Sequence, residues 1–530
     1  MKKLIIFFIM SLWFLQACYE DKGNYTYAEL NEVEVTIPLK SGYTIRSYWG
    51  EEIVVEPTLK FANPKDTLEF DYVWRCDLDT ISHERILKYT PTGACKNYTL
   101  QLYVIDRKTQ FTYYGTVSLA VNTPYKYGFA LLAEKSDGSS AIHYLRLETA
   151  DAPNYYYTPF YDVYVKEQPG DPLGKKPYYM AENLSTTANG GDELTVLQED
   201  GRNVSLAGTD FAKVVYLDEE FSGGVYPDGM KPKEVYFSGG NNVDVVLGDN
   251  GKVYTRVNPN TTQSGGFHQT YFLPLPQYFD KSNTYVDRLI PGHPYSRLVM
   301  MYDKENHRLV GVAADGTSSV NGAPVVINDK SSNPDDFVNL NDLGDYELIW
   351  IADWGKVYGT GKYASILKKD GVYYYQAFNL TKQNNQTAVD VSNQSKSLFA
   401  GNGVVSDNTK YAMMYTGNYM YFAEGKSLYY CEFRNEGGVI RQIVKHVHDF
   451  DKNIVCLEGD YNGGRLLIAL EGGKLYLFDT SDQVLGSPDP WSAGKMYESP
   501  DDANLGEIKR IIFKWGDTNN RNNAGDATPF

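Results

Sequence analysis

The strongest constraint on the fold is a hairpin pattern that recurs along most of the chain. Each copy has a short apolar run, a turn with glycine or asparagine, and a second run that usually contains tyrosine. The turns lie at Gly138, Gly201, Gly251, Asn306, Gly371, Gly425 and Gly473. They recur roughly every 56 residues, which is typical of a β-propeller with one such hairpin per blade. The pattern predicts a seven-bladed propeller over residues 125–515. Chance recurrence of hairpins in a large β protein is the alternative.

The last strand-like segment could close such a ring. Ile508–Trp515 is apolar, and a single blade cannot bury both of its faces. We expect this segment to complete the blade that begins near Tyr127. Short apolar runs separated by Gly, Asn and Asp dominate the whole chain, and long helical patterns are few. The sequence therefore predicts an all-β protein.

A shorter group of strand-like runs precedes the propeller region. Residues 28–122 hold about seven short strands, which favours an immunoglobulin-like β-sandwich. The clearest runs are Val33–Ile37, Ile53–Val55, Phe70–Trp74, Tyr98–Val104 and Phe111–Val121. We expect Trp74 to lie between the sheets, where its burial contributes about 2–3 kcal/mol.

Two of these runs resemble strands of PKD (polycystic kidney disease) domains. Tyr72-Val73-Trp74 is similar to the third strand of that family, and the alternating run Tyr98–Asp106 is similar to the sixth. Arg75-Cys76-Asp77 stands where the family usually has a glycine-aspartate turn. The resemblance therefore implies a divergent PKD-like module.

The cysteines leave two arrangements open. Cys76 ends one of the PKD-like strands and Cys95 precedes the other, and these strands are antiparallel neighbours in such a sandwich. A Cys76–Cys95 disulfide would stabilise the module by about 3 kcal/mol, and two separate thiols are the alternative. The state of Cys431 and Cys456 stays open.

The N-terminus has the anatomy of a bacterial signal peptide over residues 1–17. Lys2 and Lys3 precede an apolar run that is shorter than the ~20 residues needed to span a bilayer. The segment that ends at Cys18 resembles the lipobox of bacterial lipoproteins, which implies an acylated Cys18. An ordinary secretory signal beside a cysteine is the alternative. Glu20 and Asp21 follow, and they resemble the export signal that sends Bacteroidetes lipoproteins to the cell surface. Residues 18–27 then form a polar tether.

Charge and motifs exclude several kinds of chemistry. The net charge of −17 argues against nucleic acid as a partner, since phosphate binding needs basic residues. No Gly-x-Ser-x-Gly or His-Glu-x-x-His motif occurs. His446 and His448 could meet one metal ion from the same face of a strand, but no third ligand is evident and we expect them at the surface. The sequence thus indicates no catalytic residue, no metal and no cofactor, although a propeller could still gather scattered acids at its axis.

Aromatic residues are the best candidates for ligand contact. The chain has 45 tyrosines, and the stretch 150–190 is long for a single blade and carries Tyr155, Tyr156, Tyr157 and Tyr161. Long loops are often functional, and these rings could stack on sugars or receive peptide side chains. Packing of the loop onto the propeller is the alternative. Trp354 is a second candidate, with a core role equally open.

Taken together, these features resemble the PKD-like family lipoproteins of Bacteroidetes. Such proteins are typically encoded beside SusC-like transporters and SusD-like lipoproteins. The resemblance implies a non-enzymatic accessory lipoprotein on the outer face of the outer membrane, which binds or presents an oligopeptide or glycan to a TonB-dependent importer. A propeller hydrolase or lyase is one alternative, and a purely structural transporter subunit is another. Residues 516–530 are a polar tail.

Overall fold

The chain divides into two compact units, Met1–Val121 and Asn122–Phe530. The computed structural model describes residues 32–39, 44–62, 69–147, 157–184, 192–237, 243–257, 268, 270–290, 298–314, 322–354, 360–382, 387–414, 419–436, 439–460 and 464–516. Within these ranges, no helix is both long and apolar enough to cross a membrane.

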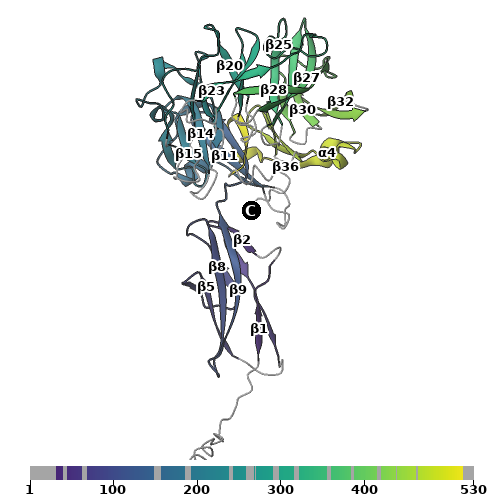
Figure 1. The fold of residues 1–530 in the computed structure, drawn as a ribbon. Helices are drawn as coiled ribbons and strands as arrows, with labels where there is room; N and C mark the ends of the chain where they lie inside the picture. The colour runs from purple at the N-terminus through teal and green to yellow at the C-terminus, as the bar shows by residue number, and fades with distance from the viewer. Residues whose placement is uncertain are drawn as a thin grey trace, which may run out of the picture. The chain divides into compact units, whose positions relative to one another are not determined.

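The first unit is built only from strands in its described part. They are β1 (Val33–Thr36), β2 (Thr44–Tyr48), β3 (Ile53–Val55), β4 (Thr58–Phe61), β5 (Phe70–Cys76), β6 (Asp79–Ser82), β7 (Leu87–Tyr89), β8 (Asn97–Asp106) and β9 (Thr112–Asn122). Five form one sheet in the order β2-β9-β8-β5-β6, while β1 pairs with β4 and β3 pairs with β7 (Figure 1). The long strands β5 and β8 are antiparallel neighbours, as the sequence predicts.

The core of the first unit forms around Trp74. This ring is completely buried, and its Nε1 donates a hydrogen bond to the Glu84 carbonyl oxygen at 3.0 Å. Leu100, Leu102 and Val104 alternate along β8 and are equally buried, because every second side chain of a strand faces the same side.

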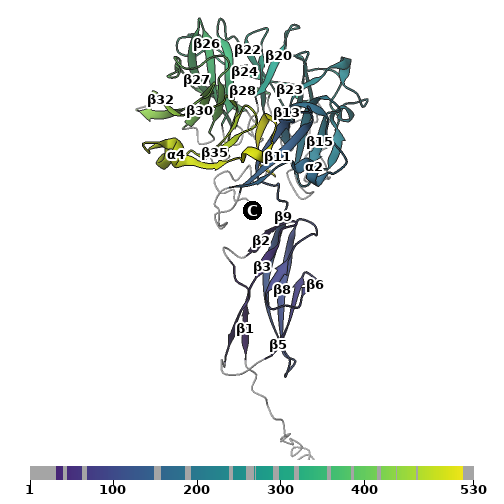
Figure 2. The same ribbon diagram turned by 180° about the vertical axis from the view of Figure 1, so that it is seen from behind.

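In its described residues, the second unit is a β-propeller of seven sheets, and the inner strands of each sheet pair antiparallel (Figures 1 and 2). The first three blades, from the inside outward, are β37 (Glu507–Lys514), β10 (Gly128–Glu134), β11 (Ser140–Leu147) and β12 (Tyr157–Phe160); β13 (Lys175–Asn183), β14 (Glu193–Asp200), β15 (Val204–Ala207) and β16 (Lys213–Tyr216); and β17 (Pro232–Tyr236), β18 (Val243–Gly248) and β19 (Val253–Val257).

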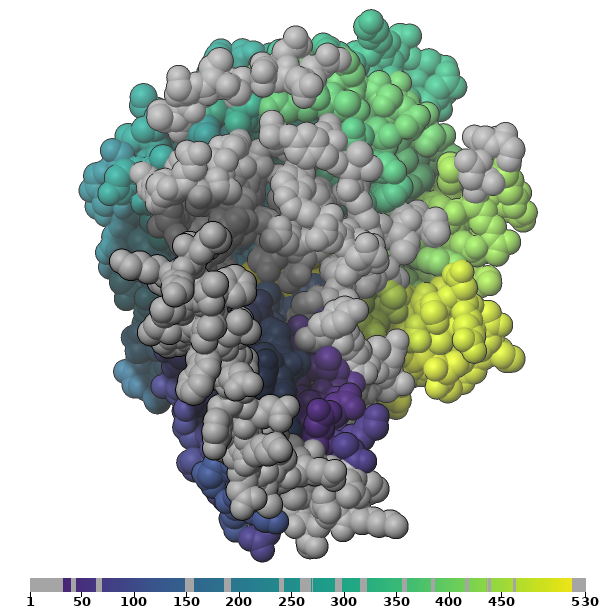
Figure 3. Space-filling view, turned by 60° about the horizontal axis from the view of Figure 1, so that its bottom comes forward, coloured from purple at the N-terminus to yellow at the C-terminus, as the bar shows by residue number. Residues whose placement is uncertain are grey.

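The other four blades follow the same plan. They are β20 (Val286–Ile290), β21 (Val299–Asp303), β22 (Arg308–Ala313) and β23 (Ala323–Pro324); β25 (Glu347–Asp353), β26 (Thr360–Lys369), β27 (Val372–Lys382), β28 (Ala388–Leu398) and β24 (Val326–Asn328); β29 (Lys410–Met413), β30 (Tyr419–Glu424), β31 (Ser427–Glu436) and β32 (Val439–Asp449); and β33 (Ile454–Gly459), β34 (Arg465–Leu470), β35 (Leu475–Asp479) and β36 (Lys495–Glu498). The colours pass around the ring from teal through green to yellow (Figure 3).

Short helical turns occupy some of the connections between strands. They are α2 (Val163–Glu167), η1 (Leu217–Glu220), η2 (Pro227–Gly229), α3 (Asp482–Leu485), α4 (Pro490–Gly494) and η4 (Asp501–Ala503).

The seven turns identified in the sequence fall in seven different blades. Each joins the second and third strands counted from the inside. The six glycines adopt positive φ angles between 55° and 114°, a region that favours glycine because it lacks a Cβ. In the fourth blade, His307 takes this conformation next to Asn306, with φ of 46°.

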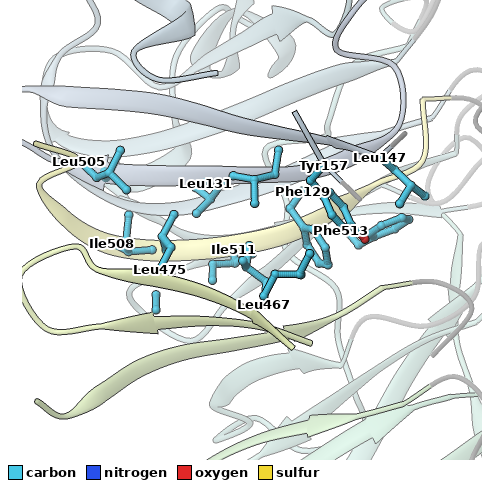
Figure 4. Close-up of a cluster of buried hydrophobic side chains, with 14 of the residues drawn as sticks. Phe129, Leu131, Leu147, Tyr157, Leu467, Leu475, Leu505, Ile508, Ile511 and Phe513 are labelled. Carbon is cyan, nitrogen blue, oxygen red and sulfur yellow. The ribbon is translucent and has the colours of Figure 1, made fainter. Parts of the chain in front are cut away.

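The first blade is completed by the last strand, as the sequence predicts. β37 pairs antiparallel with β10, and Phe513 lies opposite Phe129. Its apolar side chains enter a buried cluster between the first and seventh blades (Figure 4), which includes Tyr157, Leu467 and Leu475. The closing strand therefore belongs to the core of the ring.

The expectation of one long loop at 150–190 is wrong for the described part of that stretch. It contains the outer strand of the first blade, β12, then α2, then the innermost strand of the second blade, β13. The many tyrosines obscure the alternation of these strands, because tyrosine suits both a core and a surface.

Candidate functional site

The innermost strands of the seven blades surround the propeller axis. They are β37, β13, β17, β20, β25, β29 and β33, each at the edge of its sheet. Consecutive members contact one another from β29 through β33, β37, β13, β17 and β20 to β25. The rings of Trp350 on β25 and Tyr411 on β29 are 5.3 Å apart and link the remaining pair. Side chains from seven distant segments are thereby brought to one axis.

Six of these strands share a local irregularity. In each, the pairing register with the next strand shifts by one residue, while β29 pairs without a shift. Such an extra residue changes the direction of the side chain that follows it. The residues that follow the shift are Tyr179, Glu234, Arg288, Trp350, Cys456 and Arg510. We call these six residues the axial ring.

Contacts between neighbouring strands connect the members of the axial ring. The Arg510 guanidinium lies 4.3 Å from the centroid of the Tyr179 ring. Arg288 Nη1 donates to the Ile349 carbonyl oxygen at 2.8 Å, and Glu234 Oε2 accepts from the Leu289 amide at 2.9 Å. Each contact bridges two blades, so the ring is a property of the assembled propeller.

Two acids on which Arg510 acts have raised pKa values. Burial raises the pKa of Glu458, two residues after Cys456 on β33, to about 7, although the charge of Arg510 opposes the shift. Burial also raises the pKa of Glu234, and a backbone hydrogen bond from Leu289 and the charge of Arg510 oppose it. The charge of Arg510 thus acts on acids of two different blades, Glu458 of the seventh and Glu234 of the third.

A second charged group of the ring is fully paired. Asp287 Oδ2 accepts from Arg288 Nε at 3.1 Å, and Asp287 Oδ1 lies 3.3 Å from Lys233 Nζ. Burial would raise the pKa of Asp287, but these two cations lower it overall. Arg288 and Lys233 are therefore engaged within the protein.

The remaining titratable members of the ring are neutral at physiological pH. Burial raises the pKa of the Cys456 thiol to about 11, so the thiolate that a nucleophile requires is scarce. Burial likewise raises the pKa of Tyr179 to about 12. The ring therefore offers charge, hydrogen bonds and aromatic surface, and its thiol is not activated.

A buried ion pair secures the end of the closing strand. Lys514 Nζ lies 2.7 Å from Asp192 Oδ2 and donates to the Tyr125 carbonyl oxygen at 2.6 Å. Glu182 accepts hydrogen bonds from the Trp515 and Gly516 amides. Burial and the charge of Asp192 raise the pKa of Glu182 to about 8. These groups are structural, because they hold β37 against β13.

Another buried charged cluster lies between the second and third blades. Arg256 Nη1 lies 2.6 Å from Glu220 Oε1 and its Nε lies 2.9 Å from Asp244 Oδ2. His268 is hydrogen-bonded to Glu220 at 2.7 Å and to Glu193 at 3.0 Å. Burial alone would lower the pKa of His268, but the two carboxylates raise it to about 9.

Open clefts are lined by residues outside the axial ring. One of about 850 Å³ lies beside the closing strand and is lined by Glu134, Lys135, Lys474 and neighbouring residues. Another of about 530 Å³ lies in the first unit along Val33, Phe61 and Tyr113. Lys135 and Lys474 are already paired, with Asp162 and Asp501 respectively.

The described aromatic residues predicted to contact ligand lie in two different clusters, Tyr157 and Tyr161 in one and Trp354 in another. Tyr155 and Tyr156 lie outside the described residues. Tyr157 is 9% exposed and packs in the cluster between the first and seventh blades, so it is a core residue instead. The Tyr161 hydroxyl is hydrogen-bonded to the Tyr497 hydroxyl. Trp354 is half-buried, with Lys362 Nζ 5.0 Å from its ring. Among the described residues, Tyr157 and Tyr161 are therefore close together in one cluster, and Trp354 packs in a different one.

The two candidate histidines have different partners. His446 Nε2 lies 2.9 Å from Asp449 Oδ1, whereas His448 stacks on Trp491 with centroids 4.6 Å apart. The pairing register shifts between them, so they do not share a face as a regular strand would require. The described part of the chain contains no group of three side chains that could hold a metal ion.

The other predicted sites stay predictions. Cys18, Glu20 and Asp21 lie outside the described residues. Cys76 is buried at the end of β5 and Cys95 is exposed before β8, and both are present as thiols. A disulfide between Cys76 and Cys95 stays a prediction from the sequence.

Sequence reasoning did not find the axial ring. Its six members are common residue types on six separate strands, and the position of each depends on a register shift that no local sequence pattern predicts. The stretch around Tyr179 was singled out for its tyrosines. The other available signal was Glu458, an acid that alternates with apolar residues in the strand-like run around Cys456.

Comparison with known proteins identifies a PKD-like region in the N-terminal part of the chain. Residues 18–177 match the model of the PKD-like family, a span that begins in the first unit and continues into the propeller as far as the start of β13. A search of curated proteins gave no match. The chain is therefore an all-β protein with a PKD-like N-terminal region and a seven-bladed propeller, the latter defined by its sheet order.

Several solved structures are similar at low identity. One is a quinonprotein alcohol dehydrogenase-like protein from Bacteroides thetaiotaomicron, with 12% identity, coverage of 90% of this chain and 99% of that one, and a TM-score of 0.39. A protein from Lactobacillus plantarum shows 11% identity, coverage of 73% and 99%, and a TM-score of 0.43. The WD40 domain of Toxoplasma gondii coronin shows 12% identity, coverage of 66% and 78%, and a TM-score of 0.36.

Proposed function

We propose that this protein is a lipid-anchored lipoprotein of the bacterial outer surface that binds a nutrient ligand. The ligand is an oligopeptide or a glycan, and the protein presents it to a SusC-like TonB-dependent importer with a SusD-like partner. Acylated Cys18 is the anchor and Glu20-Asp21 the export signal.

The axial ring is the observation that carries the binding function. It brings Arg510, Tyr179, Trp350 and Glu234 from separate blades to the strands around the axis, and the acid Glu458 lies two residues after its member Cys456. Binding sites typically combine aromatic surface with a few convergent polar groups. The Cys456 thiol has a raised pKa, which favours binding over covalent chemistry.

Purification from membranes tests the anchor and the partners together. The tagged full chain is solubilised from outer membranes in mild detergent, beside a Cys18→Ala variant. We expect a SusC-like transporter to accompany the native chain, and Cys18→Ala to leave the membrane fraction. Recovery of the native chain without any transporter would contradict the accessory role.

Catalysis by a propeller hydrolase or lyase is a second candidate. The raised pKa of Glu458 favours it, because an acid that titrates near neutral pH suits general acid–base catalysis. Turnover of surface polysaccharides or peptides that is lost in Glu458→Gln, with binding retained, would support the enzyme. Absence of turnover in both proteins would leave the binding function.

A purely structural subunit is the third candidate. It would co-purify with the transporter and yet bind no ligand. Variants of the axial ring would then leave nutrient uptake unchanged in cells, whereas the binding function predicts that they slow it.

A further inference from the structure

We propose that the axial ring binds the carboxylate group of an acidic ligand, and that Arg510 is the residue that receives it. The inference rests on the proposed binding function and names the ligand class for the same site.

Arg510 lacks the internal partners that the other arginine of the ring has. Its Nε is buried without a hydrogen-bond partner among the described residues, and it takes part in none of the ion pairs found there. Arg288, in contrast, is bonded to Asp287 and to the Ile349 carbonyl oxygen. A donor withheld from water without an acceptor costs about 1–3 kcal/mol. An external acceptor would remove that cost.

The shape of the Arg510 group points to a planar anion. Arg510 Cζ lies over the Tyr179 ring, 4.3 Å from its centroid, and the Nε–H donor of the guanidinium has no acceptor among the described residues. A guanidinium edge donates two parallel hydrogen bonds to a carboxylate. Stacking on an aromatic ring also fixes its orientation, so less entropy is lost when the ligand binds.

The acids around Arg510 favour a single negative charge on the ligand. Glu458 titrates at about 7 because it is buried, so near neutral pH a large fraction is uncharged. The uncharged carboxyl can donate a hydrogen bond to an incoming carboxylate. A dianion such as phosphate would be repelled by Glu234 and by the remaining charge on Glu458.

The ligand affinity should therefore depend on pH through Glu458. Arg510 on β37 and Cys456 on its own strand interact electrostatically with Glu458. Tyr179 and Glu234 from other blades act on Arg510, and Lys410 on β29 acts on Cys456. The pKa values of Cys456 and Tyr179 are about 11 and about 12, so neither changes charge between pH 6 and 8. Glu234 is the other acid with a raised pKa.

Calorimetry with paired probes tests the ligand class. The pairs are trigalacturonate against galactotriose, and trialanine against its C-terminal amide, titrated into the full chain at pH 6.5. We expect one acidic probe to bind about tenfold or more tightly than its neutral counterpart. The pair that responds tells a glycan carboxylate from a peptide carboxylate.

Variants assign the effect to Arg510. Arg510→Gln should lower the affinity for the acidic probe by about tenfold or more. The control is Arg202→Gln, which removes another arginine that stacks on a tyrosine, Tyr216, at 3.7 Å but away from the axis. It should bind as the native chain does. Melting temperatures establish that each variant is folded.

Three results would overturn the proposal. They are equal binding of acidic and neutral probes, native affinity in a folded Arg510→Gln, and no binding of any acidic probe at millimolar concentration. Should Arg510→Gln unfold, Glu458→Gln carries the test. The affinity of the native chain for the acidic probe must then fall as the pH rises from 6 to 8, and the affinity of Glu458→Gln must not change over this range. If neutral probes bind equally well to the native chain and to Arg510→Gln, the carboxylate site is refuted but the proposed binding function is not.

Discussion

At the scale of single residues, His268 shows how one side chain can fix a connection between blades. It lies beyond β19 and is hydrogen-bonded to Glu220 and Glu193, which belong to η1 and β14. Its side chain is 26% exposed while both acids are buried. The charged imidazole therefore compensates acids that are otherwise costly to bury.

The stability that His268 provides should depend on pH. Its pKa is about 9 in the folded chain and about 6.5 when unfolded. Because the folded value is higher, the contribution is complete below about 6.5 and is lost as the pH rises through about 9. We expect His268→Gln to destabilise the propeller by about 1.5–3 kcal/mol at pH 6, and much less at pH 10.

Urea denaturation of both proteins across this pH range measures the difference. His446→Gln is the matched control, because this imidazole is exposed and is bonded to a single acid, Asp449. If the difference in unfolding free energy between the native chain and His268→Gln stays constant from pH 6 to 10, the stabilising role of the charged imidazole is contradicted.

At the scale of elements, the closing strand β37 is held by two ion pairs of different character. Lys514 and Asp192 are both buried, whereas Lys509 and Glu134 reach the solvent with 35% and 27% exposure of their side chains. Removing one partner of a buried pair leaves an isolated charge in the protein, but removing one partner at the surface leaves a hydrated group.

We expect Lys514→Ala to destabilise the propeller by about 3–5 kcal/mol. Lys509→Ala, in the same strand, should cost less than about 1 kcal/mol. Guanidinium denaturation followed by tryptophan fluorescence compares the two variants. Similar losses in both would mean that the buried pair is not what secures the strand.

The elements also show what sequence can and cannot predict. The turn glycines and the apolar closing strand carry local signals, so the blades and the closure were predictable. The burial of Trp74 followed from its alternating strand. For Tyr157 the sequence left both ligand contact and packing open, because tyrosine suits both environments. The direction of the Arg510 side chain depends on a register shift and on neighbours from other blades. Neither can be predicted from the sequence of its own strand.

At the scale of the whole molecule, the chain contains two units with separate cores. One core surrounds Trp74, and the propeller has clusters between its blades, including one at Trp491. Units that bury their own apolar surface can unfold in separate transitions. Stability should therefore be described for each unit and not by a single midpoint.

Calorimetry of two tryptophan variants tests this independence. Trp74→Ala should lower the stability of the first unit by about 3–5 kcal/mol and leave the propeller transition in place. Trp491→Ala should do the reverse. If either substitution shifts both transitions equally, the units unfold as one.

The pairing of β37 with β10 sets an order of events during synthesis. The first blade lacks its innermost strand until the ribosome has made the last one, so β10 has an open edge for almost the entire time of translation. An open strand edge pairs readily with other chains. The proposed export would benefit from this delay, since a ring that cannot close early can still pass unfolded through a translocon. Chaperones would then have to cover the edge until the final strand is made.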